Sequence, residues 1–376
     1  MALTIGILTP RSDMFPTLGK DLLQGFRLGL GNEYDGVKYL VEGIGNATDD
    51  SIIRTAEKLL IQEDVDLVIA FCGSILLESL GRVFESYQKP LFHVDLGSNA
   101  LKLKHQNSFV AYHSLNLWQS NYTAGKYAAD TFGKKGLLAA SFYDGGYQHS
   151  EALVTGYREA GGELVDFYVA PMDYKNEDFS TLLEVIESKD PEVVFLLFSY
   201  KEADKLLQAL SKSKLNGKYP FVAMPVLTDE SMYEENHGIQ QLVSIGSWSF
   251  DEKRSTMQEF VSVYQELKGS HPNLIHLLGY EMGQATSQLL ETHGEIPSKL
   301  SEALQKLTIA TPRGNLSYNA YGESQVEEFK IRKFNFNEVR YHNEVIGTVE
   351  ADFSSGLYKQ FEPLEYTGWQ NPYICT

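Results

Sequence analysis

The stretch Gly25-Phe26-Arg27-Leu28 returns later in the chain as Gly156-Tyr157-Arg158-Glu159, each copy on a predicted helix that follows a hydrophobic strand and a polar loop. Two more phrases recur in the same order. Residues 63–69 are echoed by 189–195, and residues 89–92 by 218–221. This period is far longer than that of a solenoid repeat. The repeat therefore predicts two similar α/β lobes on one chain.

The hydrophobic pattern predicts alternating strands and helices in both halves of the chain. In the first half we expect strands at 3–8, 37–42, 67–70 and 90–94, and helices at 18–31, 51–62 and 75–87. In the second half we expect strands at 137–142, 163–170, 193–198, 221–224 and 242–248, with helices at 122–132, 150–160, 179–188, 201–210, 256–268, 279–293 and 300–307. The tail changes to β structure at 314–318, 327–335 and 338–346.

Length and charge exclude several classes of protein. A chain of 376 residues favours two domains over one. The formal net charge of −18 argues against binding to nucleic acid or to anionic lipid. No apolar run reaches the length of a membrane span. The first strand begins almost at once, at Leu3, so either the protein is cytoplasmic or an export signal is missing from this sequence.

Motifs for catalysis and cofactors are mostly missing. There is no zinc-protease, Walker or nucleophile-elbow motif. The loop 43–48 lacks the third glycine of a dinucleotide fingerprint. The cysteines, Cys72 and Cys375, have no metal-binding spacing, and we expect Cys72 to be a small buried hydrophobic residue. We expect no cofactor, no metal and no enzymatic activity.

Small polar residues follow neighbouring strands of the predicted first sheet. Gly73 and Ser74 lead into a helix, where free backbone N–H groups and a hydroxyl make a site for an anion. Gly97 and Ser98 follow the next strand and supply a second hydroxyl. The alternative is that both serines are only caps or turn residues. Two such residues at adjacent strand ends favour contact with a ligand.

The matching strand ends of the second lobe carry tyrosines. Tyr143 and Tyr147 flank Asp144 after one strand, and Ser199 and Tyr200 follow another. A tyrosine offers a flat apolar face and a hydroxyl tip, which suits closure over a small ligand. The sequence therefore predicts a binding cleft between the lobes.

The chain resembles a type I periplasmic binding protein of the branched-chain amino acid (Leu/Ile/Val-binding) family over nearly all of its length. The resemblance rests on the order of several modest motifs. They are the opening strand and loop 7–12 with Gly25-Phe26-Arg27-Leu28, the turn Cys72-Gly73-Ser74, Gly97-Ser98, Asp144-Gly145-Gly146-Tyr147 and Thr311-Pro312-Arg313-Gly314-Asn315-Leu316-Ser317-Tyr318. Gln148 stands where the family usually has glycine.

This resemblance implies an α/β fold of two Rossmann-like lobes that are joined by three crossings and close on a ligand. We expect the N-terminal lobe to comprise residues 1–119 plus 251–326, and the C-terminal lobe 120–250 plus 327–376. The crossings are expected near 117–121, 249–253 and 324–328.

The resemblance also implies how the ligand is held. The family's carboxylate-binding positions fall on Ser74, Gly97 and Ser98, and Tyr147 contributes from the second lobe. The acid that pairs the ligand ammonium falls on Pro225, a departure that argues against an α-amino acid. Either Asp229, Asp144 or Asp95 replaces that acid, or the ligand has no ammonium, with Arg11 as a second anion partner. The residues expected to contact ligand are Arg11, Phe15, Cys72, Gly73, Ser74, Gly97, Ser98, Trp118, Tyr147, Ser199, Tyr200, Pro225, Thr228 and Tyr280.

The function implied is that of an extracytoplasmic solute-binding protein, periplasmic or extracellular, that delivers a small carboxylate-bearing ligand to the membrane permease of an ABC importer. A monomer is expected. The alternative is the ligand-binding domain of a membrane receptor with the same fold. A DNA-binding regulator is disfavoured, because no basic helix-turn-helix precedes Leu3.

Overall fold

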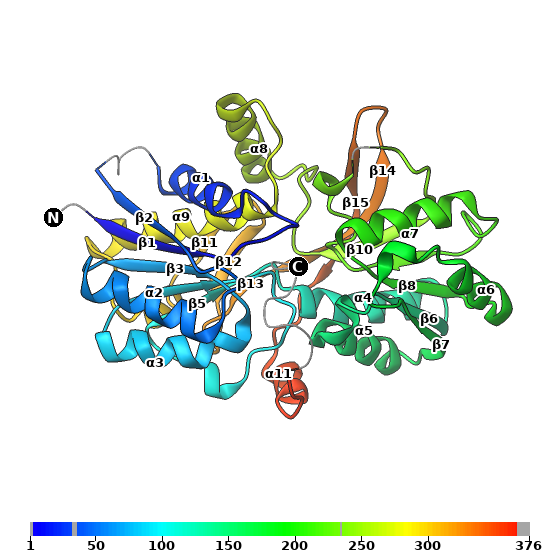
Figure 1. The fold of residues 1–376 in the computed structure, drawn as a ribbon, viewed down its shortest axis with the longest axis horizontal. Helices are drawn as coiled ribbons and strands as arrows, with labels where there is room; N and C mark the ends of the chain where they lie inside the picture. The colour runs from blue at the N-terminus through cyan, green and yellow to red at the C-terminus, as the bar shows by residue number, and fades with distance from the viewer. Residues whose placement is uncertain (1–2, 32–35, 234, 367–376) are drawn as a thin grey trace.

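The computed structural model describes residues 3–31, 36–233 and 235–366. It has two α/β lobes that lie side by side, each built on its own twisted sheet (Figure 1). The two-lobed α/β fold predicted from the repeat is therefore confirmed. None of the helices in the described ranges combines the length and hydrophobicity needed to cross a membrane.

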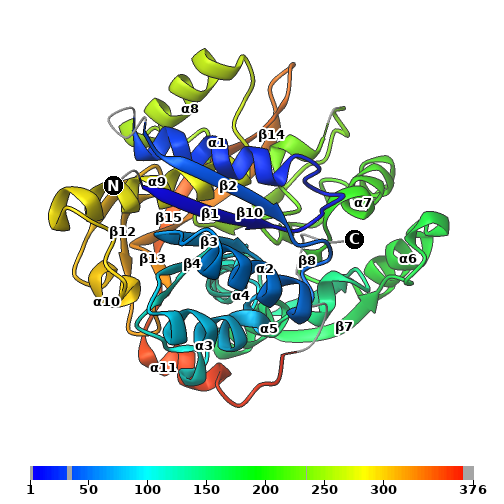
Figure 2. The ribbon, with the colours of Figure 1, turned by 60° about the vertical axis from the view of Figure 1, so that its left-hand side comes forward.

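The first lobe contains a five-stranded parallel sheet in the order β2-β1-β3-β4-β5. Its strands are β1 (Thr4–Thr9), β2 (Lys38–Gly43), β3 (Leu67–Phe71), β4 (Leu91–Val94) and β5 (Val110–His113). Its helices are α1 (Leu18–Leu30), α2 (Asp49–Ile61), α3 (Leu77–Tyr87), α8 (Ser255–Lys268), α9 (Leu274–His293) and α10 (Leu300–Leu304). Figure 2 shows α1 and α9 on one face of this sheet, and α2 and α3 on the other.

The repeated glycine marks the same kind of helix contact in both lobes. A Cβ on Gly25 of α1 would lie 2.1 Å from the carbonyl oxygen of His276 on α9. A Cβ on Gly156 of α5 (Gln148–Glu159) would lie 2.0 Å from that of Tyr122 on α4 (Leu117–Thr131). Only glycine permits such close approach of two helix backbones. The repeated glycine therefore marks the same close helix–helix contact in both lobes.

The second lobe contains a seven-stranded sheet in the order β15-β14-β10-β9-β8-β6-β7. Its strands are β6 (Lys135–Ala140), β7 (Glu163–Val169), β8 (Val193–Leu197), β9 (Phe221–Ala223), β10 (Leu242–Gly246), β14 (Glu328–Phe336) and β15 (Tyr341–Glu350). The first five are parallel, whereas β14 and β15 are antiparallel. Helices α6 (Ser180–Lys189) and α7 (Tyr200–Lys212) complete the lobe.

The chain passes between the lobes three times. It leaves β5 for α4 through residues 114–116, and β10 for α8 through residues 247–254. It returns at Glu327, between β13 (Ser324–Val326) and β14. Strand β13 belongs to a small antiparallel sheet with β11 (Ile309–Thr311) and β12 (Gly314–Tyr318).

The described C-terminal segment, residues 353–366, forms an arm that contacts both lobes. Its helix α11 (Ser355–Phe361) lies between them in Figure 1. The ring of Tyr358 meets Trp118 of α4 edge-on, with centroids 5.2 Å apart, and stacks on Tyr321 of the first lobe at 4.3 Å.

Beyond α11, one carbonyl of the arm joins the two lobes. The oxygen of Leu364 accepts hydrogen bonds from Lys102 Nζ of the first lobe and from Gln148 Nε2 of the second. The segment expected to belong wholly to the C-terminal lobe therefore touches both, as far as residue 366, and residues 367–376 lie outside the described ranges.

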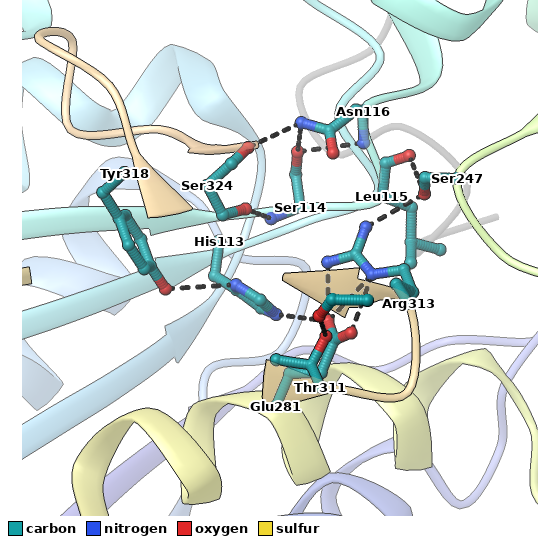
Figure 3. A network of polar contacts seen from close by, with 11 residues as sticks. His113, Ser114, Leu115, Asn116, Ser247, Glu281, Thr311, Arg313, Tyr318 and Ser324 are labelled. Atoms are coloured by element: carbon teal, nitrogen blue, oxygen red, sulfur yellow. Dashed lines mark hydrogen bonds and ion pairs between the residues drawn. The ribbon is translucent and has the colours of Figure 1, made fainter. Parts of the chain in front are cut away.

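A buried ion pair connects the crossings (Figure 3). Arg313, in the turn between β11 and β12, donates from Nε and Nη2 to the carboxylate of Glu281 on α9, at 2.8 and 2.6 Å. Its Nη1 donates to Ser247 Oγ on the second crossing, and Ser247 Oγ donates to the carbonyl of Leu115 on the first. Burial raises the pKa of Glu281, but the charge of Arg313 and the bonds from Arg313 and His113 lower it further, to about 2.

The third crossing joins the same network. Ser324, at the start of β13, accepts from the backbone N–H of Ser114 through its hydroxyl at 3.1 Å, and from Asn116 Nδ2 through its carbonyl at 2.8 Å. All three crossings are therefore tied together by buried polar contacts.

We predict that Arg313→Met destabilises the protein by about 3–5 kcal/mol, because it leaves the buried Glu281 carboxylate without its partner. The free energy of unfolding in urea would measure the loss. Arg340→Met, which removes a half-exposed pair with Asp251, should cost under about 1 kcal/mol. The double variant Arg313→Met/Glu281→Gln should recover part of the stability. Equal losses for Arg313→Met and Arg340→Met would contradict the central role of the buried pair.

Candidate functional site

A pocket lies between the lobes where the loop after β1 faces the start of α7. It has a volume of about 770 Å³ and is lined by residues 9–13 and 43–45 of the first lobe and by Tyr200 and Lys201 of the second. A neighbouring pocket of about 300 Å³ adds Ser199 and Tyr143. The predicted contact residues Arg11, Ser199 and Tyr200 therefore line an interlobe cleft.

The two serines of the predicted anion site are buried at adjacent strand ends. Ser74 follows β3 and Ser98 follows β4, and each is only 1% exposed. The hydroxyl of Ser98 has no hydrogen-bond partner among the described residues, whereas the hydroxyl of Ser74 interacts with that of Tyr366 in the C-terminal arm. Gly73, just before Ser74, accepts from the N–H of Leu76 in the first turn of the 3-10 helix η2 (Ser74–Leu76). A buried hydroxyl without a partner costs free energy, which a ligand acceptor would offset.

The backbone donors of this site are already occupied by an internal carboxylate. Asp95 Oδ2 accepts from the N–H of Ser74 at 3.0 Å, and Oδ1 accepts from the N–H of Gly97 at 2.6 Å and from the hydroxyl of Tyr112. The expectation that the N–H of Ser74 is free for a ligand was wrong, since Asp95 reaches it from the next strand end. Burial raises the pKa of Asp95 to about 6 despite these hydrogen bonds.

Gly97 has a conformation and surroundings that exclude other residues. Its φ is +83°, and a Cβ would lie 2.7 Å from Ser114 Oγ. Its carbonyl accepts from the N–H of Trp118 at 2.8 Å. It shapes the loop that presents Ser98.

The lobes touch beside Ser98. The carbonyl of Ser98 accepts from the N–H of His149 at the start of α5, at 2.9 Å. Gln148, the departure from the family pattern, accepts from the N–H of Ala100 through Oε1 at 2.9 Å. Tyr147 is buried before them, 6.0 Å from the ring of His149 between centroids. Tyr147 and Ser98 therefore lie at one interlobe contact.

The loop after β9 rests on a buried arginine instead of presenting an acid. Arg332 of β14 donates from Nη2 to the carbonyl of Pro225 at 3.1 Å and to Thr228 Oγ1 at 3.0 Å. Its guanidinium lies 4.5 Å from the ring centroid of Trp248. Burial lowers the pKa of Arg332 to about 10, so it stays charged at neutral pH. The charged guanidinium of Arg332 therefore contacts Pro225, the position at which the family has its acid.

The other acids suggested as partners for an ammonium have different surroundings. Asp144 Oδ1 accepts from Ser199 Oγ at 3.0 Å, below the interlobe pocket. Asp229 accepts from the N–H and hydroxyl of Ser231 and caps a short 3-10 turn. Of the three, Asp144 is the one whose hydrogen-bond partner lines the cleft.

Two predicted contact residues pack within the first lobe, away from the pockets described above. Phe15 is 4% exposed and belongs to the main hydrophobic core. Tyr280 is partly buried and packs on Phe260 of α8, with ring centroids 4.7 Å apart. Neither lines the interlobe pockets.

Cys72 and Trp118 are also buried in packed surroundings. Cys72 Sγ lies 3.2 Å from His93 Nε2, and burial raises the pKa of the thiol well above its usual value. This confirms Cys72 as a small buried residue, and Cys375 lies outside the described residues. Trp118 is covered by Tyr358 of the arm. Its indole Nε1 has no partner within the described ranges.

Sequence reasoning missed Glu202 and Arg332. Glu202 lines the smaller interlobe pocket from the first turn of α7. Its position, directly after Ser199-Tyr200-Lys201 at a strand end, was a signal that could have identified it. Arg332 had no comparable signal, because a strand of alternating charged and aromatic residues reads as solvent-exposed.

The buried titratable groups predict an unusual pH dependence of stability. Burial raises the pKa of one aspartate to about 8 and of three glutamates to about 7, namely Asp144, Glu202, Glu230 and Glu323. The folded protein then holds more protons than the unfolded chain, so the stabilising contribution of these acids is present at low pH and is lost as the pH rises through their folded pKa values. Burial lowers the pKa of His93 and His149 to about 3, so below about pH 6.5 these histidines have the opposite effect and oppose the acids. The unfolding free energy should therefore decrease clearly between about pH 6.5 and about pH 8.5.

Urea denaturation across this pH range would test the slope. Glu323→Gln should make the decrease above pH 6.5 shallower, whereas Glu184→Gln, on an exposed position of α6, should leave it unchanged. Stability that increases between about pH 6.5 and 8.5 would contradict the assignment.

Comparisons with known proteins agree with this geometry. The sequence model of a family described as periplasmic binding protein matches residues 2–333. The Leu/Ile/Val-binding protein homolog 6 of Brucella suis biovar 1 is 19% identical over 378 residues, covering 95% of this chain and 94% of the relative.

Solved structures share the fold. A solute-binding protein of an ABC transporter from Rhodopseudomonas palustris BisB5, in complex with 3,4-dihydroxybenzoic acid, superposes with a TM-score of 0.78 at 19% identity, covering 94% of this chain and 99% of its own. A leucine-binding protein from Thermotoga maritima gives a TM-score of 0.66 at 16% identity, with 93% and 99% covered. Because the family model spans most of the sequence, the chain belongs to the periplasmic binding protein family.

Proposed function

We propose that this protein is the extracytoplasmic solute-binding component of an ABC importer and captures a small carboxylate-bearing ligand between its lobes. The observation that carries the proposal is the pair of buried hydroxyls on Ser74 and Ser98 at adjacent strand ends, of which that of Ser98 has no partner among the described residues and that of Ser74 meets Tyr366 of the arm. A carboxylate has enough lone pairs to accept from both. The partner implied is a membrane permease, and the protein itself performs no chemistry on the ligand.

The charges around the cleft favour an anionic group at the first lobe. Asp95 already uses the backbone donors, so the ligand carboxylate is assigned to the serine hydroxyls. Arg11 lines the adjoining pocket and is 4.0 Å from Asp13. It can turn toward an anion when the cleft closes.

The loop after β9 argues against a simple branched-chain amino acid. Arg332 lies beneath Pro225, where the resemblance calls for an acid opposite an α-ammonium. An α-ammonium there would meet no carboxylate at position 225, and the buried acids of the same loop, Glu230 and Asp229, already act on Arg332. The 3,4-dihydroxybenzoic acid in the R. palustris neighbour is a carboxylate without an amine. An aromatic or aliphatic carboxylate therefore fits this cleft better.

A thermal-shift panel tests the ligand class. We expect aromatic or aliphatic carboxylates to raise the melting temperature, while leucine and valine have little effect. A ligand at 100 times its dissociation constant stabilises a protein by about 2.7 kcal/mol, which is readily measured. A shift with micromolar leucine or valine and none with any other carboxylate would overturn the role given to Pro225 and Arg332.

A double substitution tests the anion site. Ser74→Ala/Ser98→Ala should weaken binding of a carboxylate ligand by about 2–4 kcal/mol, at about 1–2 for each donor to a desolvated charge. Isothermal titration calorimetry measures the change. Ser86→Ala, on the exposed surface of α3, is the matched control and should bind normally. Unchanged affinity in the double variant would place the carboxylate elsewhere.

A further inference from the structure

Glu202 is a buried carboxylate that faces the cleft without a full set of partners. It is 5% exposed and lines the 300 Å³ pocket with Tyr143, Ser199 and Tyr200. Its Oε1 has no hydrogen-bond partner among the described residues. Buried carboxylates are normally paired or hydrogen-bonded on both oxygens, so an oxygen without a partner suggests that a ligand donates to it.

A second acid lies directly behind it. Asp144 is 3% exposed, and its Oδ1 accepts from Ser199 Oγ, whose residue lines the same pocket. Burial raises the pKa of Glu202 by more than the charge of Lys205 lowers it. Burial, with a smaller contribution from Glu202, raises the pKa of Asp144 to about 8. One carboxylate, Glu202, therefore lines the pocket, and a second, Asp144, lies near it.

The cations near this pocket are engaged elsewhere. Lys201 Nζ lies 5.0 Å from the ring centroid of Tyr200, and Lys205 Nζ donates to the carbonyl of Lys175 at 2.8 Å. Arg11 lies 4.0 Å from Asp13, which adds a third acid to the pocket wall. Burial is the main cause of the raised pKa of Glu202. A hydrogen bond with Ser141 lowers this pKa, and the negative charge of Glu177 raises it. Apart from Arg11 and the two lysines, the charged side chains named around this pocket are carboxylates.

We propose that the pocket formed by Glu202, Tyr143 and Tyr200, with Asp144 behind it, binds a cationic group of the ligand, an ammonium or a guanidinium. Glu202 Oε1 accepts a charge-assisted hydrogen bond from it, and Asp144 adds a second negative charge. The group is organic, since no cluster of three metal-ligating side chains exists among the described residues.

This inference rests on the proposed function and narrows its substrate class. The serine hydroxyls follow β3 and β4, whereas the acid pocket faces Asp13 in the loop after β1. The carboxylate and the cation of one ligand would therefore bind to different parts of the cleft, one on each lobe. The ligand is then a carboxylate with a cationic group at its far end, and the loop after β9 takes no part in binding that cation.

The titration of the two acids gives a signature of cation binding. Burial raises the pKa of Glu202 to about 7 and that of Asp144 to about 8, so both are partly protonated at neutral pH. A cation favours the ionised forms, so its binding should release protons and should tighten as the pH rises from about 6 to about 8. A neutral group in the same pocket should do neither.

Matched pairs of carboxylates, each with and without a terminal cation, test the proposal. The pairs are 4-(aminomethyl)benzoate with 4-ethylbenzoate, 6-aminohexanoate with heptanoate, and 4-guanidinobutanoate with 4-ureidobutanoate. Calorimetry in two buffers of different ionisation enthalpy reports affinity and proton release together. In at least one pair we expect the cationic member to bind about 10- to 100-fold more tightly, as hydrogen bonds to charged groups do, with protons released.

Glu202→Gln should remove both the preference and the proton release while carboxylate binding remains. Glu184→Gln, on the exposed surface of α6, should change neither. Asp144→Asn should reduce proton release, and its melting temperature shows whether it folds. If the neutral members bind as well as the cationic ones, or if Glu202→Gln keeps the preference, the cation pocket is refuted and the proposed function stands. If no member of any pair binds, the carboxylate function falls, and the cation pocket with it.

Discussion

The bidentate pair between Arg313 and Glu281 is the contact on which the rest of the molecule depends. It lies where the three crossings meet, and through Ser247 and Leu115 it fixes the second crossing to the first. A buried ion pair is not by itself a source of stability, because desolvation opposes the attraction. Its value here is geometric. The two sheets keep one relative orientation because the polypeptide segments between them share a single charged centre.

The two faces of the cleft are chemically opposite. At the ends of β3 and β4 the first lobe offers neutral hydroxyls, since Asp95 has already taken the backbone donors there, while Arg11 and Asp13 lie in the loop after β1. The second lobe offers carboxylates on α7 and beside it, and a buried arginine under the loop after β9. An electrically asymmetric cleft orients its ligand before it closes, because only one orientation places each charged end near a favourable partner. Recognition of the two ends is then divided between the lobes.

The sequence was a good guide to the lobes and a partial guide to the cleft. Repeated glycines and strand patterns are local signals, and they identified most of the strands and helices and the strand ends at Ser74, Ser98 and Ser199, but not β5, β11, β13 or α11. The roles of Asp95 and Arg332 could not be predicted, because each depends on a partner that is brought near by folding. Asp95 reaches Ser74 from the neighbouring strand, and Arg332 reaches Pro225 from a strand 107 positions later. Trp118 was predicted to contact the ligand, but Tyr358 of α11 packs against it.

The arm has a consequence for how the protein melts. Proteins with two cores often show two calorimetric transitions, because each core can lose its structure alone. Here Leu364 is bonded to both lobes, and Tyr358 packs on Trp118 and on Tyr321. Neither lobe can unfold without breaking contacts that α11 makes with it. The lobes are therefore coupled into a single cooperative unit, and heat should denature them together.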